Sequence, residues 1–201
     1  ELKLRHPGLE IESCASGGGR IDLGMAQHAD RFWTSDCNDA ADRQRIQRYT
    51  QFAIPPELLG SHIGPTKSHT TLRVHELSFR AVTALFGHAG LEWDITQCTE
   101  AELAQLKSWA SYYKANRDLL HSGQMVRVDR SDGTSFVHGV VSQDQRRAIF
   151  AYATLGTQGG SRPAGIRFAG LRENANYRVK AAFPAGEPKF LQRAQVQWLD
   201  G

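Results

Sequence analysis

Short apolar runs alternate with helical patterns along residues 1–121, and this alternation constrains the fold more than any other feature. The runs typical of buried strands lie at residues 9–14, 31–36, 57–64 and 90–95. The helical patterns lie at residues 38–53, 76–87 and 102–120. Strands that alternate with helices across short connections run parallel, because each helix carries the chain back to the start of the next strand. The order predicts an α/β fold, and four such units in a row fit one half of a (β/α)8 TIM barrel.

Helix-end signals support two of these helices. Thr99 and Glu102 have the spacing of a capping box, so a helix is expected to begin just after Thr99. Its apolar face is expected at Leu103, Leu106, Trp109 and Tyr113. The helix over 38–53 has Asn38 as its expected N-cap and ends before the helix-breaking Pro55.

The pattern changes near residue 122 to short alternating stretches separated by Gly, Asp and Asn. These stretches lie at residues 123–129, 136–141, 147–155, 164–171 and 176–183. Alternation of this kind predicts antiparallel strands. We therefore expect two domains, an α/β domain over 1–121 and an antiparallel β-sandwich over 122–201.

Composition excludes several classes of function. The net charge is +3, and the basic residues are interleaved with acidic ones, as in "DAADRQRIQR", so nucleic-acid binding is not expected. Mean hydropathy is −0.45 and no apolar run approaches the ~20 residues that cross a bilayer, so no membrane partner is expected. The chain opens with "ELKLRHPGLEIES", which has no signal-peptide pattern and no Met, and we expect a fragment of a longer protein.

Cysteine and histidine spacing gives no metal site or cofactor. Three cysteines without a CxxC pair argue against a disulfide framework and a zinc site, and favour a reducing, cytoplasmic location. The histidines of one region match neither HExxH nor an i, i+4 pair; they are His62, His69, His75 and His88. We interpret them as loop and packing residues.

Cys14 and Asp36 each end a predicted strand, so both should lie at the edge of the sheet where barrel enzymes carry their catalytic groups. Asp36 is a candidate general acid, with Phe32 and Trp33 as apolar neighbours. The alternative is that Asp36 only caps the next helix. The carboxylates of Asp22, Asp30 and Asp39 are interpreted as structural.

Gly17, Gly18 and Gly19 predict a tight turn that can approach a ligand closely. The stretch has neither GxxxxGK[ST] nor GxGxxG, so it is not a phosphate loop. No GxSxG follows a strand, which excludes a serine nucleophile of that type.

Four long motifs closely resemble glycoside hydrolase family 36, the bacterial-type retaining α-galactosidases. They are "SCASGGGRIDLGM", "DRFWTSDCNDA", "PPELLGSHIGPTKSHTT" and "LSFRAVTALFGHAGLEWDIT". The resemblance covers about residues 5–141 and implies the C-terminal portion of such an enzyme. It implies that 9–14 and 32–36 are the fifth and sixth strands of the barrel, and that an antiparallel β domain follows.

The resemblance also assigns site residues. Asp36 in "WTSD" matches the family's proton donor, and Cys14 matches a residue that contacts the galactose ring. Gly17 would bring its backbone N–H to a sugar hydroxyl, and Trp33 is expected on the substrate side. The family's nucleophile is the aspartate of a Lys-Trp-Asp motif upstream of this chain. "EWD" at residues 92–94 lacks the lysine and follows the acid, so we reject it as the nucleophile and expect the chain alone to be inactive.

The implied activity is retaining hydrolysis of terminal α-galactosyl groups in oligosaccharides such as melibiose and raffinose. The implied partners are these α-galactosides, and a homo-oligomer is expected for the full-length protein. Two alternatives stay open. One is a galactosyltransferase of the raffinose-synthase type, and the other is a non-catalytic sugar-binding or assembly module carried by residues 122–201.

Overall fold

The computed structural model describes residues 1–130, 133–156 and 165–188. The α-helices are α1 (Leu2–Arg5), α2 (Leu23–Ala26), α3 (Ala40–Thr50), α4 (Leu77–Thr83) and α5 (Glu100–Ser122). Two 3₁₀ turns are η1 (Pro56–Leu58) and η2 (Ile95–Gln97). The strands are β1 (Glu12–Ser13), β2 (Arg31–Trp33), β3 (Leu59–Ile63), β4 (His88–Leu91), β5 (Gln124–Val128), β6 (Ser135–Val141) and β7 (Ala148–Thr154).

Two sheets of different kinds follow one another along the chain. Strands β1 to β4 form a parallel sheet in sequence order, and β5 to β7 form an antiparallel sheet in sequence order. The α/β fold expected from the alternation of strands and helices is confirmed. None of the helices within the described ranges has the length and hydropathy to span a bilayer.

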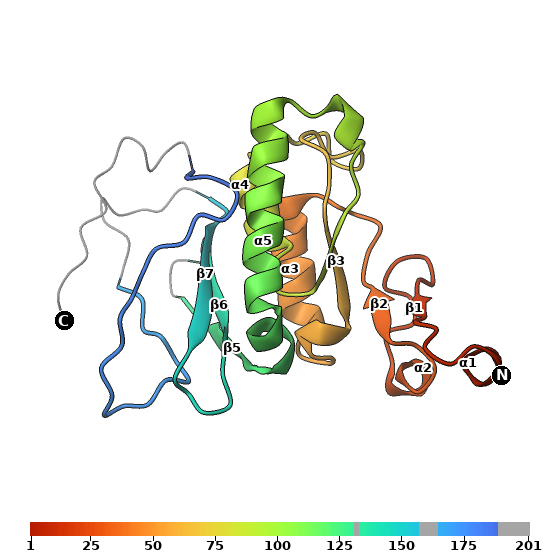
Figure 1. The fold of residues 1–201 in the computed structure, drawn as a ribbon, viewed down its shortest axis with the longest axis horizontal. Coiled ribbons are helices and arrows are strands. Elements are labelled where there is room, and N and C mark those ends of the chain that lie inside the picture. Colours follow the sequence, from red (N-terminus) through yellow and green to blue (C-terminus); the bar gives the residue numbers. More distant parts are fainter. Residues whose placement is uncertain (131–132, 157–164, 189–201) are drawn as a thin grey trace.

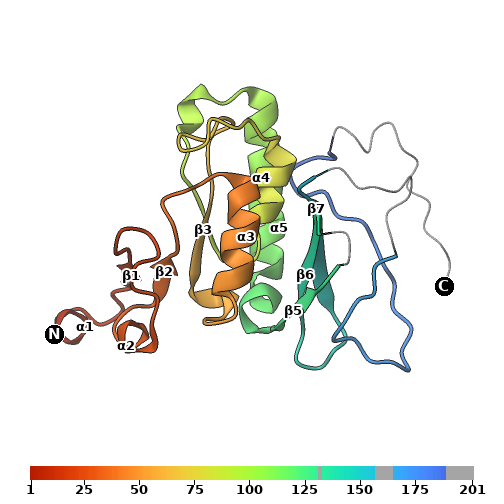
Figure 2. The same cartoon turned by 180° about the vertical axis from the view of Figure 1, so that it is seen from behind.

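Helices α3, α4 and α5 lie between the two sheets (Figure 1), and the view from behind shows the same layering (Figure 2). On the helix-facing side of the parallel sheet, Phe32 and Leu59 pack with Ile54. Ile63 belongs to the larger core, which includes Trp109 and Leu120 of α5. The apolar side chains of the strands therefore bury themselves against the helices.

The opposite face of the parallel sheet carries polar and aromatic side chains. A Cβ placed on Gly60 would lie 2.9 Å from Glu12 Oε2 and 3.2 Å from Trp33 Cε3, so these side chains share its face. His62 stands two residues further along β3 and points to the same side, because side chains alternate along a strand.

The start of α3 differs from expectation, whereas the start of α5 agrees with it. Asp39, not Asn38, is the N-cap of α3: its carboxylate accepts hydrogen bonds from the backbone N–H groups of Ala41 and Asp42. The capping box of α5 between Thr99 and Glu102 is confirmed. Leu103, expected on the apolar face of α5, is 42% exposed, while the other members of that face are buried.

Three strand predictions need correction. The strand expected at 90–95 is β4 at His88–Leu91, because the pairing with β3 ends at Leu91 and Asp94 then caps η2. The described residues of the stretches 164–171 and 176–183 form no strand. Their polar groups bond the turn after β6 instead, where Tyr177 donates to the Gln145 carbonyl. Residues 157–164 and 189–201 of the expected β domain lie outside the described residues.

Candidate active site

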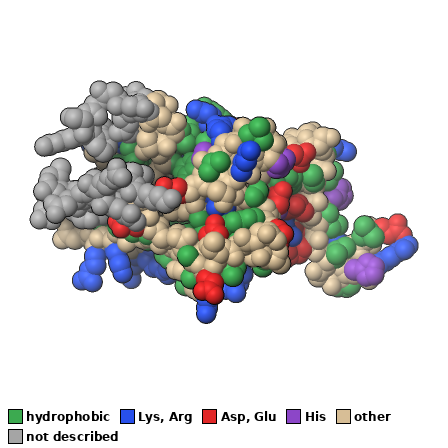
Figure 3. Space-filling view, turned by 90° about the horizontal axis from the view of Figure 1, so that it is seen from above, with side chains coloured by type: hydrophobic (Ala, Val, Ile, Leu, Met, Phe, Trp, Pro, Cys, Tyr) green, Lys and Arg blue, Asp and Glu red, His purple; other side chains and the backbone are tan. Residues whose placement is uncertain are grey.

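The loops that follow the parallel strands meet at one edge of the sheet, because parallel strands end on the same side. Residues 14–22 follow β1, residues 34–39 follow β2, and residues 64–76 follow β3. Figure 3 views the molecule from above and looks onto this edge, where acidic, basic and histidine side chains are interspersed. Ligand and catalytic sites of parallel α/β proteins lie at this edge.

Asp36 lies in the loop after β2 and is exposed to solvent. The capping role that was the alternative for Asp36 belongs to Asp39. Within the described part of the chain, no side chain or backbone group makes a hydrogen bond or ion pair with the Asp36 carboxylate. The carboxylate is thus open to solvent at this edge of the sheet.

The glycine turn packs directly against the backbone of the Asp36 loop. Gly17 is buried and has a φ of +70°, and a Cβ on it would lie 3.0 Å from Ser35 Cα and 3.1 Å from Asp36 N. A Cβ on Gly18 would lie 2.6 Å from the Thr34 carbonyl oxygen. Only residues without a side chain allow this approach. The structure therefore brings Gly17 and Asp36 together.

Cys14 and Trp33 lie in different surroundings. Cys14 is an exposed free thiol just beyond β1. Trp33 is 8% exposed, with its ring stacked on His62 at a centroid distance of 4.4 Å and the Arg43 guanidinium carbon 4.0 Å from its centroid. Sugar contact by either residue stays a prediction. For Trp33 the contact would have to use the ring edge, because neighbours cover its faces.

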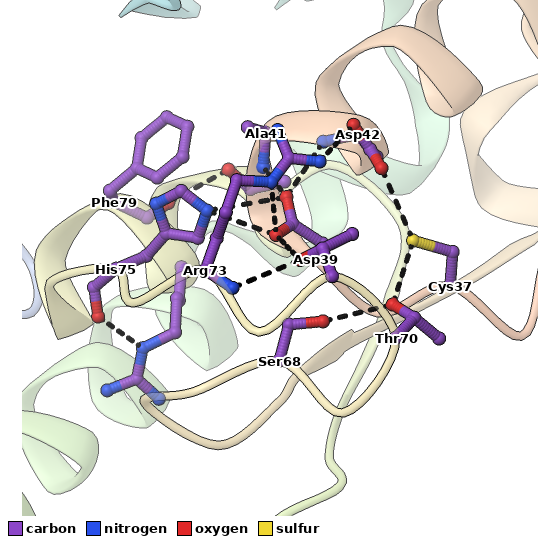
Figure 4. Close-up of polar contacts among 12 residues, drawn as sticks. Cys37, Asp39, Ala41, Asp42, Ser68, Thr70, Arg73, His75 and Phe79 are labelled. Atoms are coloured by element: carbon purple, nitrogen blue, oxygen red, sulfur yellow. Dashed lines mark hydrogen bonds and ion pairs between the residues drawn. The ribbon is translucent and has the colours of Figure 1, made fainter.

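Asp39 is the centre of a buried polar cluster that joins the loops after β2 and β3 (Figure 4). Its fully buried carboxylate accepts a hydrogen bond from the Thr71 hydroxyl, forms an ion pair with Arg73 Nε at 3.1 Å and lies 3.3 Å from His75 Nε2. Arg73 also contacts Asp42 at 2.7 Å. These contacts fix the loop that carries Thr71, Arg73 and His75 against the start of α3.

The electrostatics of Asp39 follow from this cluster. Burial by itself raises the pKa of Asp39. The hydrogen bonds from Thr71 and from the Asp42 backbone, and then the charges of His75 and Arg73, outweigh burial and hold the pKa below its ordinary value. Asp39 is therefore a structural anion, as the sequence predicted.

Glu92, in the loop after β4, is a further carboxylate at this edge of the sheet. It accepts a hydrogen bond from Asn38 Nδ2 at 3.1 Å and lies 3.2 Å from His62 Nδ1. These contacts link the loop after β4 to the loop after β2 and to β3 itself. Across the described residues, no group of three or more His, Cys, Asp or Glu side chains could hold a metal ion.

Sequence reasoning missed Arg43, which is 2% exposed and contacts the Asp36 loop from α3. Burial lowers the pKa of Arg43 to about 10, and the electrostatic influence of Cys37, Glu92 and Asp36 opposes this shift. One feature of the sequence could have indicated Arg43. It is the fourth residue of its helix, and Arg80 has the same position in α4.

Comparison with known proteins identifies the family. The melibiase family model matches residues 1–123. The α-galactosidase of Escherichia coli is 44% identical over 179 residues, which cover 89% of this chain and 25% of that protein. The α-galactosidase AgaA of Geobacillus stearothermophilus is 33% identical over 181 residues, which cover 90% of this chain and 25% of AgaA.

Solved structures agree with these matches. The α-galactosidase of Lactobacillus brevis superposes with a TM-score of 0.81 at 38% identity, over 85% of this chain and 23% of that one. A substituted AgaA in complex with raffinose gives a TM-score of 0.82 at 33% identity, over 86% and 24%. This chain spans about a quarter of the length of the curated relatives it matches. These matches, and the family model over more than half of its residues, show that the chain belongs to the melibiase family, the α-galactosidases of glycoside hydrolase family 36.

Proposed function

We propose that this chain carries the acid/base side of a retaining α-galactosidase that removes terminal α-galactosyl groups from oligosaccharides such as raffinose and melibiose. One observation carries the proposal: Asp36 presents an exposed, unbonded carboxylate at the carboxyl edge of a parallel sheet, next to a buried glycine turn. Relatives crystallised with raffinose and stachyose support an α-galactoside substrate.

The proposed mechanism has two steps. Asp36 first protonates the glycosidic oxygen while a second carboxylate attacks the anomeric carbon and forms a covalent galactosyl-enzyme. Asp36, now a carboxylate, then takes a proton from the water that releases galactose. Retaining enzymes hold the two carboxyl groups about 5–5.5 Å apart. We assign the nucleophile to an aspartate outside these 201 residues.

The proposal includes the architecture around the site. Strands β1 to β4 are strands five to eight of a (β/α)8 barrel, so the polar face with Glu12, Trp33 and His62 is the barrel interior. We assign residues 1–121 to this barrel and residues 122–201 to a C-terminal antiparallel β domain, of which β5 to β7 form the described sheet. The end of α5 at Ser122 and the start of β5 at Gln124 support this boundary.

The proposal extends to the cellular location and the assembly of the protein. Three free cysteines support a reducing, cytoplasmic location. We further propose that the complete protein is a homo-oligomer. The mechanism requires neither a metal nor a cofactor, because the two carboxyl groups supply all of its proton transfer and nucleophilic chemistry.

The test compares the complete protein that carries these residues with the isolated chain of residues 1–201. The complete protein should release galactose from raffinose, and nuclear magnetic resonance should detect the α-anomer of galactose as the first product. The isolated chain should release none, because it lacks the nucleophile. First formation of the β-anomer would refute the retaining mechanism, and activity of the isolated chain would refute the external nucleophile.

A further inference from the structure

Two buried arginines occupy equivalent positions behind neighbouring strands. Arg43 is the fourth residue of α3, which follows β2, and Arg80 is the fourth residue of α4, which follows β3. Side chains on a helix point back towards its N-terminus, so an arginine at this position can reach the loop that precedes the helix. Both residues are almost fully buried, at 2% and 5% exposure.

Arg43 uses all three of its nitrogens on the loop that carries Asp36. Nε–H donates to the Cys37 carbonyl at 2.8 Å, Nη1 donates to Thr34 Oγ1 at 2.8 Å, and Nη2 donates to the Ser35 carbonyl. The guanidinium also lies over the Trp33 ring. The three acceptors belong to the residues immediately around Asp36, so the guanidinium fixes the backbone on both sides of the carboxylate.

Arg80 makes the same set of contacts with the loop after β3. Its Nε donates to the His75 carbonyl at 3.1 Å, Nη1 to the Gly64 carbonyl at 2.5 Å, and Nη2 to Thr66 Oγ1 at 3.1 Å. Its guanidinium lies 4.6 Å from the centroid of Trp93. This loop carries no candidate acid, so Arg80 is a natural control for Arg43.

Only an arginine satisfies this geometry. A buried cation costs free energy unless hydrogen bonds compensate for the lost water, and the planar guanidinium presents its donors in a fixed fork. A lysine would keep the charge but could not reach three acceptors spread over four residues in this arrangement.

We propose that Arg43 is a positioning residue that holds Asp36 in place for proton transfer to the leaving group. The inference rests on the proposed acid role of Asp36. The Asp36 side chain makes no hydrogen bond or ion pair among the described residues, so the position of its carboxylate depends on the backbone that Arg43 holds. Misplacement of a reacting group by about 1 Å can cost about 10²-fold in rate.

The test measures kcat/KM of the complete protein on raffinose, whose leaving group needs protonation, and on a nitrophenyl α-galactoside, whose leaving group does not. Arg43→Gln should lower the raffinose value by about 10²-fold and the nitrophenyl value by less than about tenfold, because general acid catalysis is worth about 10²–10⁴. Arg43→Lys should shift the ratio of the two values in the same direction. The control Arg80→Gln should lower both values by similar factors.

The outcomes separate this inference from the proposed function. The positioning role is overturned if Arg43→Gln or Arg43→Lys keeps the wild-type ratio of kcat/KM on raffinose to kcat/KM on the nitrophenyl substrate while Asp36→Ala shifts this ratio. A wild-type ratio in Asp36→Ala overturns the acid role itself. Should Arg43→Gln fail to fold, Thr34→Val removes one acceptor at nearly constant shape and should shift the ratio several-fold; an unchanged ratio there also overturns the inference.

Discussion

At the scale of single residues, Gly17 couples the glycine turn to the candidate acid. Its φ of +70° and its distance from the Ser35 and Asp36 backbone leave no room for a Cβ. Gly17→Ala should displace this backbone and lower kcat/KM on raffinose by about tenfold or more, since small misplacements at a reacting group are costly. Steady-state kinetics of the complete protein measure this.

A matched control exists for Gly17. Gly133 has a similar φ of +63°, but a Cβ on it would meet nothing within 4 Å. Gly133→Ala should lower the melting temperature through backbone strain, worth about 1–2 kcal/mol, and leave kcat/KM near the wild-type value. Equal kinetic losses in the two variants would contradict the contact between the turn and the Asp36 loop.

Sequence reasoning found some of these residues for a physical reason. Asp36 and Gly17 lie just beyond two parallel strands, and the carboxyl ends of parallel strands lie at one edge of the sheet. A correct prediction of the strands therefore places both residues at that edge. Arg43 was not found because its charge is one of several in "DAADRQRIQR", and only the fold decides which of these side chains turns inward. The stacking of Trp33 on His62 joins two different strands, so no pattern within either stretch of sequence predicts it.

At the scale of elements, the capping box of α5 makes a separate prediction. Thr99 accepts a hydrogen bond from the Glu102 backbone at 3.2 Å, and Glu102 Oε2 accepts one from the Thr99 backbone at 2.9 Å. Thr99→Ala should destabilise the protein by about 1 kcal/mol. Thermal melting measures the loss.

Ser111 is exposed in the middle of the same helix and provides a control. Ser111→Ala should be neutral or slightly stabilising. A loss of stability equal to that of Thr99→Ala would count against the cap.

Helices and strands were predictable where the apolar periodicity extended over many residues or where capping residues marked the ends. The capping box and apolar spacing predicted α5, and alternation predicted β5 to β7. The stretches near 164–171 and 176–183 alternate as well, but their described residues bond turns and not a neighbouring strand, as between the Tyr177 hydroxyl and the Gln145 carbonyl. Alternation reports a half-buried extended chain, and it does not report whether a partner strand is available.

At the scale of the whole molecule, His138 links the helix layer to the antiparallel sheet. Its ring packs edge-on against Phe86 at 4.7 Å, and burial, with the charges of Arg48 and Arg127, lowers its pKa to about 4. The folded protein therefore keeps His138 neutral where the unfolded chain, with a pKa near 6.5, binds a proton. This contribution to stability is complete above about pH 6.5 and is lost as the pH falls towards 4.

The variant His138→Phe tests this linkage. Removing the titrating ring should remove about 2 kcal/mol of the stability difference between pH 7 and pH 5, with the wild type losing more stability in acid than the variant. Melting curves of both proteins at the two pH values measure the difference. Identical pH dependence in the two proteins would show that His138 titrates alike in the folded and unfolded states.

We propose Asp36 as the proton donor of an α-galactosidase, and this role can be tested on its own. The most direct measurement is kcat/KM of the complete protein, wild type and Asp36→Ala, on raffinose and on a nitrophenyl α-galactoside. Asp36→Ala should lose about 10²–10⁴-fold on raffinose and much less on the nitrophenyl substrate, since a nitrophenolate leaves without protonation. Equal losses on both substrates, or no loss on either, would contradict this role.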